Sequence, residues 1–412
     1  MNWKLIRVVD TYLGIPLLYL GTLVRSVFRK SPAAGNPGGY KRILVVKFWG
    51  IGNIFMLLPI VAALREKFAP EELDLLTLSS NRDAAESTDF FHRIYTIDTG
   101  NAFKFAETAI SNLTTLSQKE YDLIIDFEQF ARFSALFCAL IGKHTTIGFN
   151  TSNQHRHALY THSVLYDNTV HITRSFLSLA AFADRDGAIA NQGLLQPPVP
   201  KPLRDTDIRR ELGLGANEIV ILMHIGTSGN FQERRWPTSS FMDLADRLVR
   251  AYHVTIVYTG LQDEIGLFEN EQRPLQNNGR MRNFIGKLSF RQYYALVSAS
   301  DLIVSADTAA IHMASFADVP AVGLYGPNTP LLYGPWGRNS LSLTKDLHCS
   351  PCITNFNAKI HTCRHPDGKG ACMKQISVDE VYRTVTNTYL EQNAPCRLHH
   401  AAPRTPCAAS SH

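Results

Sequence analysis

Residues 301–337 read DLIVSADTAAIHMASFADVPAVGLYGPNTPLLYGPWG, and no other part of the chain says as much about its architecture. Two short apolar runs, at 302–304 and 321–325, are separated by a helix-like segment. This order is typical of a strand–helix–strand unit in a parallel sheet. Asp307 and Thr308 then fall where a strand ends and a helix begins. Ligands of open α/β sheets bind at such positions, and free helix N–H groups can hold a phosphate there.

The same alternation of strands and helices extends over most of the 412 residues. The sequence predicts strands at 42–46, 73–78, 121–126, 145–149, 218–224 and 254–258, and helices at 54–68, 131–141, 239–252, 290–299 and 377–391. A Pro-rich segment at 196–202 divides the pattern and would suit a hinge. We therefore expect an α/β protein with two Rossmann-like, doubly wound domains, at 41–196 and 203–392. Residues 393–412 are expected to form a disordered tail.

The amino-terminal segment carries most of the net charge. Residues 1–30 hold five basic residues and one acidic residue, a net of +4, which leaves +1 for the other 382 residues. A nearly neutral body argues against nucleic-acid binding. The uncharged stretch at 11–24 is shorter than the about 20 residues that a membrane-spanning helix needs. With Trp3, Tyr12 and Tyr19, it predicts an amphipathic segment that associates with an anionic membrane surface, although a signal peptide or a buried helix would also fit.

A small-residue linker is expected at 31–40. The seven cysteines favour a reducing, cytoplasmic compartment. Four of them, Cys349, Cys352, Cys363 and Cys372, are grouped near the end of the chain. They could hold a tetrahedral metal, or they could be free or paired thiols.

Several motifs together resemble glycosyltransferase family 9, the ADP-heptose:lipopolysaccharide heptosyltransferases. They are the Gly-Ile-Gly-Asn loop at 50–53, Arg-Arg-Trp-Pro at 234–237, Asp-Thr-Ala-Ala-Ile-His at 307–312 and Tyr-Gly-Pro-Asn-Thr-Pro at 325–330. The resemblance covers about residues 41–385. It implies a GT-B fold, in which two Rossmann-like domains face a cleft, and inverting transfer from a nucleotide sugar.

Transfer from a nucleotide sugar places negative charge on the leaving diphosphate, so cations or dipoles must face it. The resemblance implies that Arg234 meets the phosphates and that Asp307 accepts hydrogen bonds from sugar hydroxyls. Thr308 and the N–H of Ala309 would add the contribution of the helix end. His312 could touch phosphate, orient Asp307, or simply be a core histidine.

Thr227 and Ser228 follow the strand at 218–224 and are candidate donor-binding residues, although an ordinary turn would explain them too. We expect no cofactor and no metal at the diphosphate. The two Asp-x-Asp matches, 184–186 and 205–207, follow no apolar strand run and are interpreted as solvated surface charges.

The general base departs from the family pattern. The family carries Asp where this chain has Asn53, and an amide is not basic enough to take a proton from a hydroxyl. Asn53 is therefore expected to position the acceptor. Glu128 is the candidate replacement, and it would face the cleft if the preceding strand ends at Asp126, whose own role could be structural. Otherwise another group serves as the base, or the activity is altered or lost.

Lys47, Arg132 and Arg156 lie in loops or at helix starts of the first domain and could meet an anionic acceptor, or could be surface cations. Lys47 and Arg132 are the candidate acceptor-binding residues.

The sequence as a whole predicts an enzyme that transfers a sugar, possibly heptose, from a nucleotide sugar to a lipopolysaccharide-core or other glycolipid acceptor. An ADP sugar is the expected donor, and the enzyme would be peripheral on the cytoplasmic face of the inner membrane. The alternatives are a catalytically impaired sugar-nucleotide-binding protein, because of Asn53, and a nucleotide-sugar epimerase of the same architecture.

Overall fold

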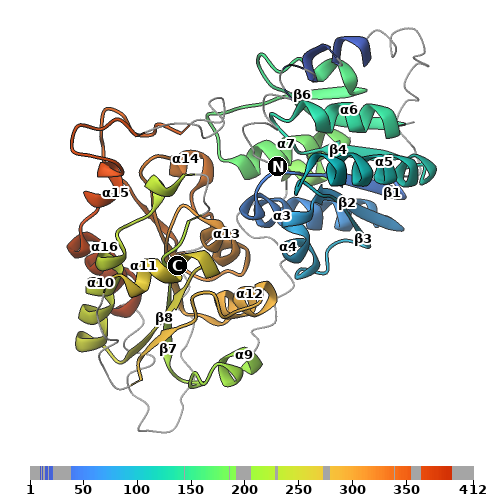
Figure 1. Ribbon diagram of the computed structural model, residues 1–412. Helices are drawn as coiled ribbons and strands as arrows, with labels where there is room; N and C mark the ends of the chain where they lie inside the picture. Colours follow the sequence, from blue (N-terminus) through green and yellow to red (C-terminus); the bar gives the residue numbers. More distant parts are fainter. Residues whose placement is uncertain are drawn as a thin grey trace.

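The computed structural model describes residues 10, 12, 14–16, 18–21, 39–142, 144–184, 186–191, 206–227, 231–271, 279–337, 339–353 and 363–391. Two six-stranded sheets form the framework, with strand orders β3-β2-β1-β4-β5-β6 and β12-β11-β10-β7-β8-β9. Every strand pair in both sheets is parallel. We call the first sheet with its helices the first lobe and the second sheet with its helices the second lobe (Figure 1).

The strands of the first lobe are β1 (Arg42–Val46), β2 (Glu72–Leu78), β3 (Arg93–Ile97), β4 (Leu123–Asp126), β5 (Thr145–Asn150) and β6 (His162–Leu165). Its helices are α3 (Ile51–Phe68), α4 (Arg82–Glu86), α5 (Ala102–Gln118), α6 (Arg132–Ile141), α7 (Ile172–Ala183) and α8 (Ala188–Asn191). Short 3-10 turns occur at η1 (Ser79–Asn81) and η2 (His157–Leu159).

The strands of the second lobe are β7 (Ile219–His224), β8 (Val254–Thr259), β9 (Met281–Asn283), β10 (Leu302–Ala306), β11 (Ala321–Leu324) and β12 (Leu341–Leu343). Its α-helices are α9 (Thr206–Glu211), α10 (Thr238–Ala251), α11 (Ile265–Glu269), α12 (Phe290–Ala299), α13 (Ala309–Phe316), α14 (Pro330–Tyr333), α15 (Ala371–Lys374) and α16 (Val378–Val385). The 3-10 turns η3 (Gln232–Arg234) and η4 (Gln262–Glu264) and the π-helix η5 (Thr386–Leu390) complete it.

The predicted fold class is confirmed, because each lobe is a parallel sheet alternating with helices. The unit predicted from 301–337 is also confirmed as β10, α13 and β11, with both strands fully buried. Strands β3, β6, β9 and β12 were not predicted. They are the outermost strands of the two sheets and are only partly buried, so they lack the continuous apolar runs of the inner strands.

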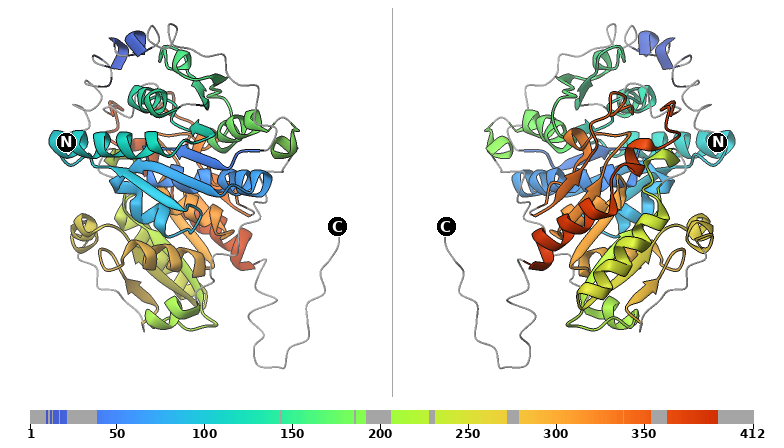
Figure 2. Two further views of the ribbon diagram at one scale, coloured as in Figure 1. Left: turned by 90° about the vertical axis from the view of Figure 1, so that its right-hand side faces the viewer. Right: turned by 90° about the vertical axis from the view of Figure 1, so that its left-hand side faces the viewer.

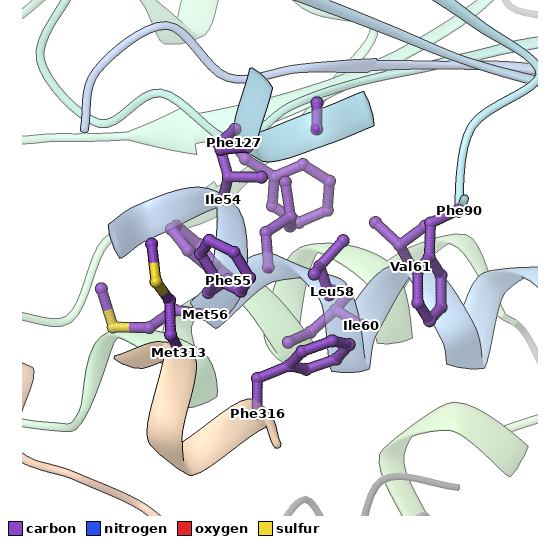
Figure 3. Close-up of a cluster of buried hydrophobic side chains, with 14 of the residues drawn as sticks. Ile54, Phe55, Met56, Leu58, Ile60, Val61, Phe90, Phe127, Met313 and Phe316 are labelled. Atoms are coloured by element: carbon purple, nitrogen blue, oxygen red, sulfur yellow. The ribbon is translucent and has the colours of Figure 1, made fainter. Parts of the chain in front are cut away.

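The two lobes meet through helix α3 of the first lobe and helix α13 of the second. Helix α3 packs against α13, and a single hydrophobic cluster runs through both. The ring of Phe55 on α3 lies 5.0 Å from that of Tyr294 and 6.0 Å from that of Phe316 on α13, centroid to centroid. Met313 of α13 lies beside them (Figure 3). This contact brings the start of α3 against the start of α13.

Some expectations concern residues beyond those described. The linker at 31–40 and the hinge at 196–202 lie wholly or almost wholly outside the described residues, as does the tail at 393–412. Only part of the segment 1–30 is described. Within the described part of the chain, no helix has both the length and the apolar character that crossing a bilayer requires.

Candidate functional site

Thr308 begins the helix at the carboxyl edge of the second sheet. Strand β10 ends at Ala306, and Thr308 has extended backbone angles while its hydroxyl accepts the N–H of Ala310 at 3.3 Å. A second hydrogen bond, 2.9 Å long, joins this hydroxyl to Oγ of Ser305. Thr308 is therefore the N-cap of α13, and the positive end of the helix dipole lies at Asp307 and Thr308.

Asp307 is the centre of a buried polar cluster. Its Oδ2 lies 3.2 Å from NH1 of Arg234, which also donates to the Asp307 carbonyl at 3.0 Å. Asn328, in the loop after β11, donates its Nδ2–H to the same Oδ2 at 2.8 Å. All three side chains are buried. The structure thus brings Arg234 and Asp307 together, and it adds Asn328, which the sequence analysis did not single out.

The cluster has the groups that a diphosphate-linked sugar needs. A guanidinium binds phosphate oxygens in a fixed geometry, and a carboxylate accepts hydrogen bonds from sugar hydroxyls. Asp307 also compensates the charge of Arg234 inside the protein, where an unpaired cation would be unfavourable. Ala309, the first residue of α13, places its backbone beside this cluster.

His312 lies at the contact between the lobes. Its ring stacks on that of Trp336, with centroids 5.8 Å apart and an interplanar angle of 17°. A Cβ atom on Gly52, in the first turn of α3, would lie only 2.5 Å from Cδ2 of His312. This glycine of the Gly-Ile-Gly-Asn motif therefore allows the start of α3 to approach α13 closely.

His171 provides a second contact between the lobes. Its Nδ1 faces Oγ1 of Thr173 at 2.8 Å, and its Nε2 lies 3.0 Å from the carbonyl oxygen of Gly334 in the other lobe. An Nε2–H donor satisfies that carbonyl while Nδ1 accepts the N–H of Thr173. Burial lowers the pKa of His171, which favours this neutral form.

Thr227 is placed by a buried carboxylate that the sequence analysis did not identify. Oε1 of Glu264 accepts the N–H of Thr227 at 2.7 Å, and its Oε2 accepts the N–H of Leu261 at 2.7 Å. Glu264 thereby ties the loop after β7 to the loop after β8. Oγ1 of Thr227 is buried and has no hydrogen-bond partner among the described residues. Ser228, the second donor-binding candidate in this loop, lies outside the described residues.

His224, at the end of β7, should make the protein sensitive to mild acid. Its Nδ1 lies 3.1 Å from both Oγ1 of Thr259 and the hydroxyl of Tyr293, and burial lowers its pKa from 6.5 to about 4. Below pH 6.5, His224 binds a proton in the unfolded chain but stays neutral in the folded chain. The free energy of unfolding therefore falls as the pH is lowered from about 6.5 to about 4. The difference between the pKa values of His224 in the unfolded and folded chains corresponds to a loss of at most about 3 kcal/mol in the free energy of unfolding. Urea unfolding at pH 7 and pH 5 should show a larger loss for wild type than for His224→Gln, and equal losses would contradict this.

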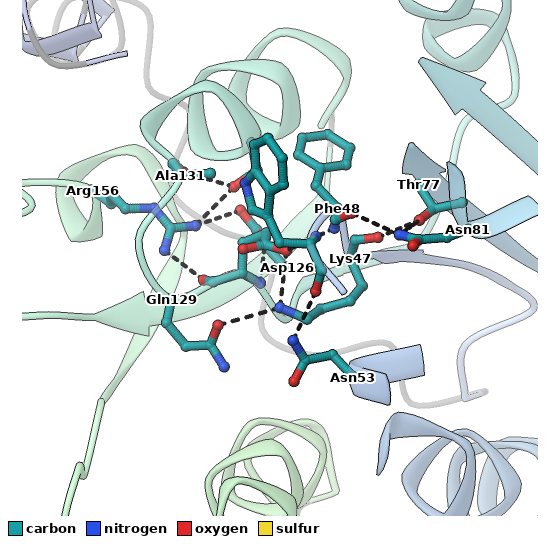
Figure 4. A network of polar contacts seen from close by, with 12 residues as sticks. Lys47, Phe48, Asn53, Thr77, Asn81, Asp126, Gln129, Ala131 and Arg156 are labelled. Carbon is teal, nitrogen blue, oxygen red and sulfur yellow. Dashed lines mark hydrogen bonds and ion pairs between the residues drawn. The ribbon is translucent and has the colours of Figure 1, made fainter. Parts of the chain in front are cut away.

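Figure 4 shows the polar contacts around Lys47, Phe48 and Asn53 in the loop after β1 and at the start of α3, and two of these contacts reach the backbone of Trp49. Oε1 of Glu128 accepts the N–H groups of Phe48 at 2.7 Å and Trp49 at 2.8 Å, together with the ammonium of Lys47 at 2.9 Å. Nδ2 of Asn53 donates to the carbonyl of the same Trp49 at 2.8 Å. Glu128 and Asn53 therefore lie on either side of one residue of the loop after β1.

The strand before Glu128 ends at Asp126, which was the condition for Glu128 to face the cleft, but the side chain of Glu128 is buried, with 2% exposed. A role of Glu128 as the base stays a prediction. Asp126 itself is fully buried. Its Oδ2 accepts NH2 of Arg156 at 2.8 Å and the hydroxyl of Tyr160 at 2.6 Å. Burial raises the pKa of Asp126, and Arg156 opposes this rise. NH1 of Arg156 donates to the carbonyl oxygen of Glu128. Arg156 therefore links the buried carboxylate of Asp126 to the backbone of Glu128.

The surface-cation alternative is wrong for Lys47, Arg132 and Arg156, because all three side chains are buried. Lys47 pairs with Glu128, as described above. Arg132 is the first residue of α6, and it pairs with Asp10 at 3.4 Å and donates to the carbonyl of Asn153 at 3.4 Å. Acceptor binding by Lys47 and Arg132 stays a prediction, with each cation already engaged by a carboxylate.

The solvated-charge interpretation of the first Asp-x-Asp match is half wrong. Asp184 is buried, accepts the N–H of Ile189 at 2.7 Å and pairs with Lys67 at 3.1 Å, whereas Asp186 is exposed. Asp184 closes the end of α7, which explains its burial.

Among the described residues, none of the four clustered cysteines forms a disulfide. Cys352 donates its N–H to the carbonyl of Pro327, and Sγ of Cys372 would lie 2.6 Å from a Cβ on Gly326. Cys352 and Cys372 therefore flank the loop that carries Asn328. Among the described residues, no three His, Cys, Asp or Glu side chains are grouped in a way that could hold a metal ion.

Comparison with known proteins gives a consistent set of relatives. Residues 111–361 match the sequence pattern of glycosyltransferase family 9 (heptosyltransferase). Lipopolysaccharide heptosyltransferase 1 of Pseudomonas aeruginosa is 24% identical over 250 residues, which span 58% of this chain and 63% of that relative. Lipopolysaccharide heptosyltransferase 3 of Escherichia coli is 21% identical over 303 residues, 70% of this chain and 85% of the relative.

The fold has close counterparts among solved structures. The structure of E. coli ADP-heptose lipopolysaccharide heptosyltransferase II superimposes with a TM-score of 0.66 at 18% identity, and it covers 85% of this chain and 99% of its own. Two Rossmann-like lobes in the GT-B arrangement are therefore the shared architecture.

Proposed function

Since the chain belongs to glycosyltransferase family 9, we propose that it is an inverting glycosyltransferase that moves a sugar from a nucleotide sugar to a lipopolysaccharide-core or related glycolipid acceptor. Heptose from an ADP sugar is the preferred donor in this proposal, because the matched relatives are named lipopolysaccharide heptosyltransferases and the matched structure is an ADP-heptose enzyme.

One observation carries the donor side of the proposal: Asp307, Arg234 and Asn328 form a single buried cluster at the carboxyl edge of the second sheet. In the proposed reaction, Arg234 and the amino end of α13 face the diphosphate and stabilise the charge that it gains as the glycosidic bond breaks. Asp307 holds sugar hydroxyls, and Asn328 keeps the Asp307 carboxylate in place.

The acceptor side requires a base. An acceptor hydroxyl attacks the anomeric carbon from the face opposite the diphosphate, the carbon–oxygen bond to the diphosphate breaks, and its electron pair leaves with the nucleotide. The hydroxyl proton goes to Glu128. Among the described residues, all hydrogen bonds to the Glu128 carboxylate reach Oε1, so Oε2 is the atom assigned to receive this proton. Asn53 positions the acceptor from the other side of Trp49.

The proposed location is the cytoplasmic face of the inner membrane, with the protein bound peripherally. The support is a glycolipid acceptor together with the net charge of +4 on residues 1–30. Lys47 and Arg132 are proposed to contact anionic groups of the acceptor, which would compete with the carboxylates that pair with them.

A thermal-shift screen with ADP, GDP and UDP sugars, followed by transfer assays with lipopolysaccharide-core acceptors, tests the proposal. We expect stabilisation by an ADP sugar and a glycosylated acceptor formed together with ADP. Stabilisation without turnover would support the sugar-nucleotide-binding alternative, and conversion of donor without acceptor would support an epimerase. No stabilisation by any nucleotide sugar would overturn the donor site.

A further inference from the structure

The described part of the amino-terminal segment is a helical stretch with large apolar side chains on its exposed side. An ordinary amphipathic helix of a soluble protein buries such side chains instead. Residues 10, 12, 14–16 and 18–21 are helical. At about 100° per residue, Gly14, Leu18 and Gly21 share one side, while Tyr12, Pro16, Tyr19 and Leu20 share the other. The first group is buried or half-buried against the first lobe, and the second is exposed. The small residues point inward and the large apolar ones outward.

The inward side lies close to α6 and η2. A Cβ on Gly14 would lie 3.2 Å from Cβ of Arg132, and a Cβ on Gly21 would lie 3.2 Å from Cδ2 of Leu159. Leu18 is buried within the same cluster as Leu159. A Cβ at either position would be tightly packed, so the small glycines allow the stretch to lie close to the lobe. The inward side therefore accounts for how this stretch is held.

Asp10 attaches the stretch to the first turn of α6. Its Oδ1 accepts the N–H of Phe133 at 3.0 Å, and its Oδ2 pairs with Arg132 at 3.4 Å. Ala131, at the N-cap position of α6, has no side chain that could cap the helix, so Asp10 supplies this cap from outside. Helix α6 begins directly after the loop of Glu128 and Gln129, so the stretch is attached to the part of the lobe that carries the assigned base.

The outward side is mostly exposed, although the ring of Tyr19 lies 5.8 Å from that of His155, centroid to centroid. Tyr12 is 74% exposed, Tyr19 59% and Leu20 56%. The stretch lies at the outer edge of the first lobe (Figure 2). Tyrosines with an aliphatic neighbour suit the boundary between lipid headgroups and acyl chains. Five basic residues and one acidic residue within 1–30 make an anionic surface the complementary partner.

We propose that Tyr12, Pro16, Tyr19 and Leu20 form a membrane-contact surface that is fixed to the acceptor lobe and inserts into the headgroup region of an anionic bilayer. This inference rests on the proposed function only in that a glycolipid acceptor would lie in the same bilayer. Because Asp10, Gly14 and Gly21 hold the stretch against α6, binding to the bilayer would set the orientation of the Glu128 loop toward the membrane surface.

Sedimentation of the full-length protein with vesicles tests this surface. Wild type should bind vesicles of mixed anionic and zwitterionic phospholipid, bind purely zwitterionic vesicles weakly, and lose binding as salt is added. The variant Tyr12→Ser/Tyr19→Ser/Leu20→Ser should bind the anionic vesicles about tenfold more weakly or worse. The control Leu331→Ser/Leu341→Ser removes two other exposed leucines, from the second lobe, and should bind like wild type.

The conservative variant Tyr12→Phe/Tyr19→Trp should retain vesicle binding, and unchanged thermal unfolding should show that the serine variant is folded. Equal binding by wild type and the serine variant would overturn the proposal. So would a loss of dimers instead of a loss of vesicle binding, since the surface would then serve a second copy of the chain. Transfer to a water-soluble, deacylated acceptor should be the same in both proteins. If neither wild type nor the serine variant transferred sugar to this acceptor, the proposed function would be wrong, but the membrane-contact surface would not be excluded.

Discussion

Glu128→Gln should lower kcat by about 10²- to 10⁴-fold while leaving the affinity for the nucleotide sugar nearly unchanged. The amide keeps the shape of the side chain and can still accept the N–H groups of Phe48 and Trp49. It cannot take a proton from the acceptor hydroxyl. Steady-state kinetics with saturating donor, together with donor binding by calorimetry, separate the two effects.

The buried Lys47 complicates this variant, because Glu128→Gln leaves its ammonium without a counter-charge. The double variant Lys47→Gln/Glu128→Gln removes both charges and should recover stability without recovering turnover. Asn53→Asp in the Glu128→Gln background returns a carboxylate to the other side of Trp49 and should restore part of the rate. Recovery of kcat in Lys47→Gln/Glu128→Gln would show that Glu128 only compensates the charge of Lys47 and holds the loop. Glu128 would then not be the base.

Asp307→Asn should reduce kcat/KM for the donor by roughly thirtyfold to several-thousandfold, which corresponds to about 2–5 kcal/mol. The substitution leaves Arg234 buried without its compensating carboxylate and weakens the hydrogen bonds to the sugar. Because Asn328 donates to the same Oδ2, the orientation of the side chain should also change. Initial rates over a range of donor concentrations measure the effect.

Asp318→Asn is the matched control, since Asp318 is exposed and follows the far end of the same helix, α13. Its positive φ of 53° is one that Asn tolerates well. It should leave kcat/KM within about twofold of wild type, as expected of a surface position. A similar small effect for Asp307→Asn would exclude Asp307 from the donor site.

The sequence was most informative where a buried strand meets a helix. The run at 302–304 and the small residues after Asp307 were enough to place Asp307 and Thr308 at the end of β10 and the start of α13, because a parallel strand buried on both faces reads as a continuous apolar run. The position of Arg234 came from its motif. Its contact with Asp307 depends on how two loops fold back over the sheet, which no local pattern determines.

Long-range partners could not be predicted for the same reason. Glu264 stands 37 residues from Thr227, and Asn328 stands 21 from Asp307, yet each makes a buried hydrogen bond to it. Lys47, predicted to bind the acceptor or to be a surface cation, instead lies in a buried ion pair with Glu128. At the amino terminus, the composition suggested an amphipathic segment, but the inward side depends on Gly14 and Gly21, which alone would be interpreted as weakening the helix.

The central claim is that the Asp307–Arg234 cluster holds a nucleotide sugar while the Glu128 loop receives the acceptor across the contact between the two lobes. A single-turnover reaction of the enzyme with ADP-heptose and a lipopolysaccharide-core acceptor, analysed by NMR for the anomeric configuration of the new linkage, tests it most directly. We expect one ADP to be released for each glycosylated acceptor, and the new linkage to have inverted configuration. Retained configuration, or release of ADP with free sugar and no glycosylated acceptor, would contradict it.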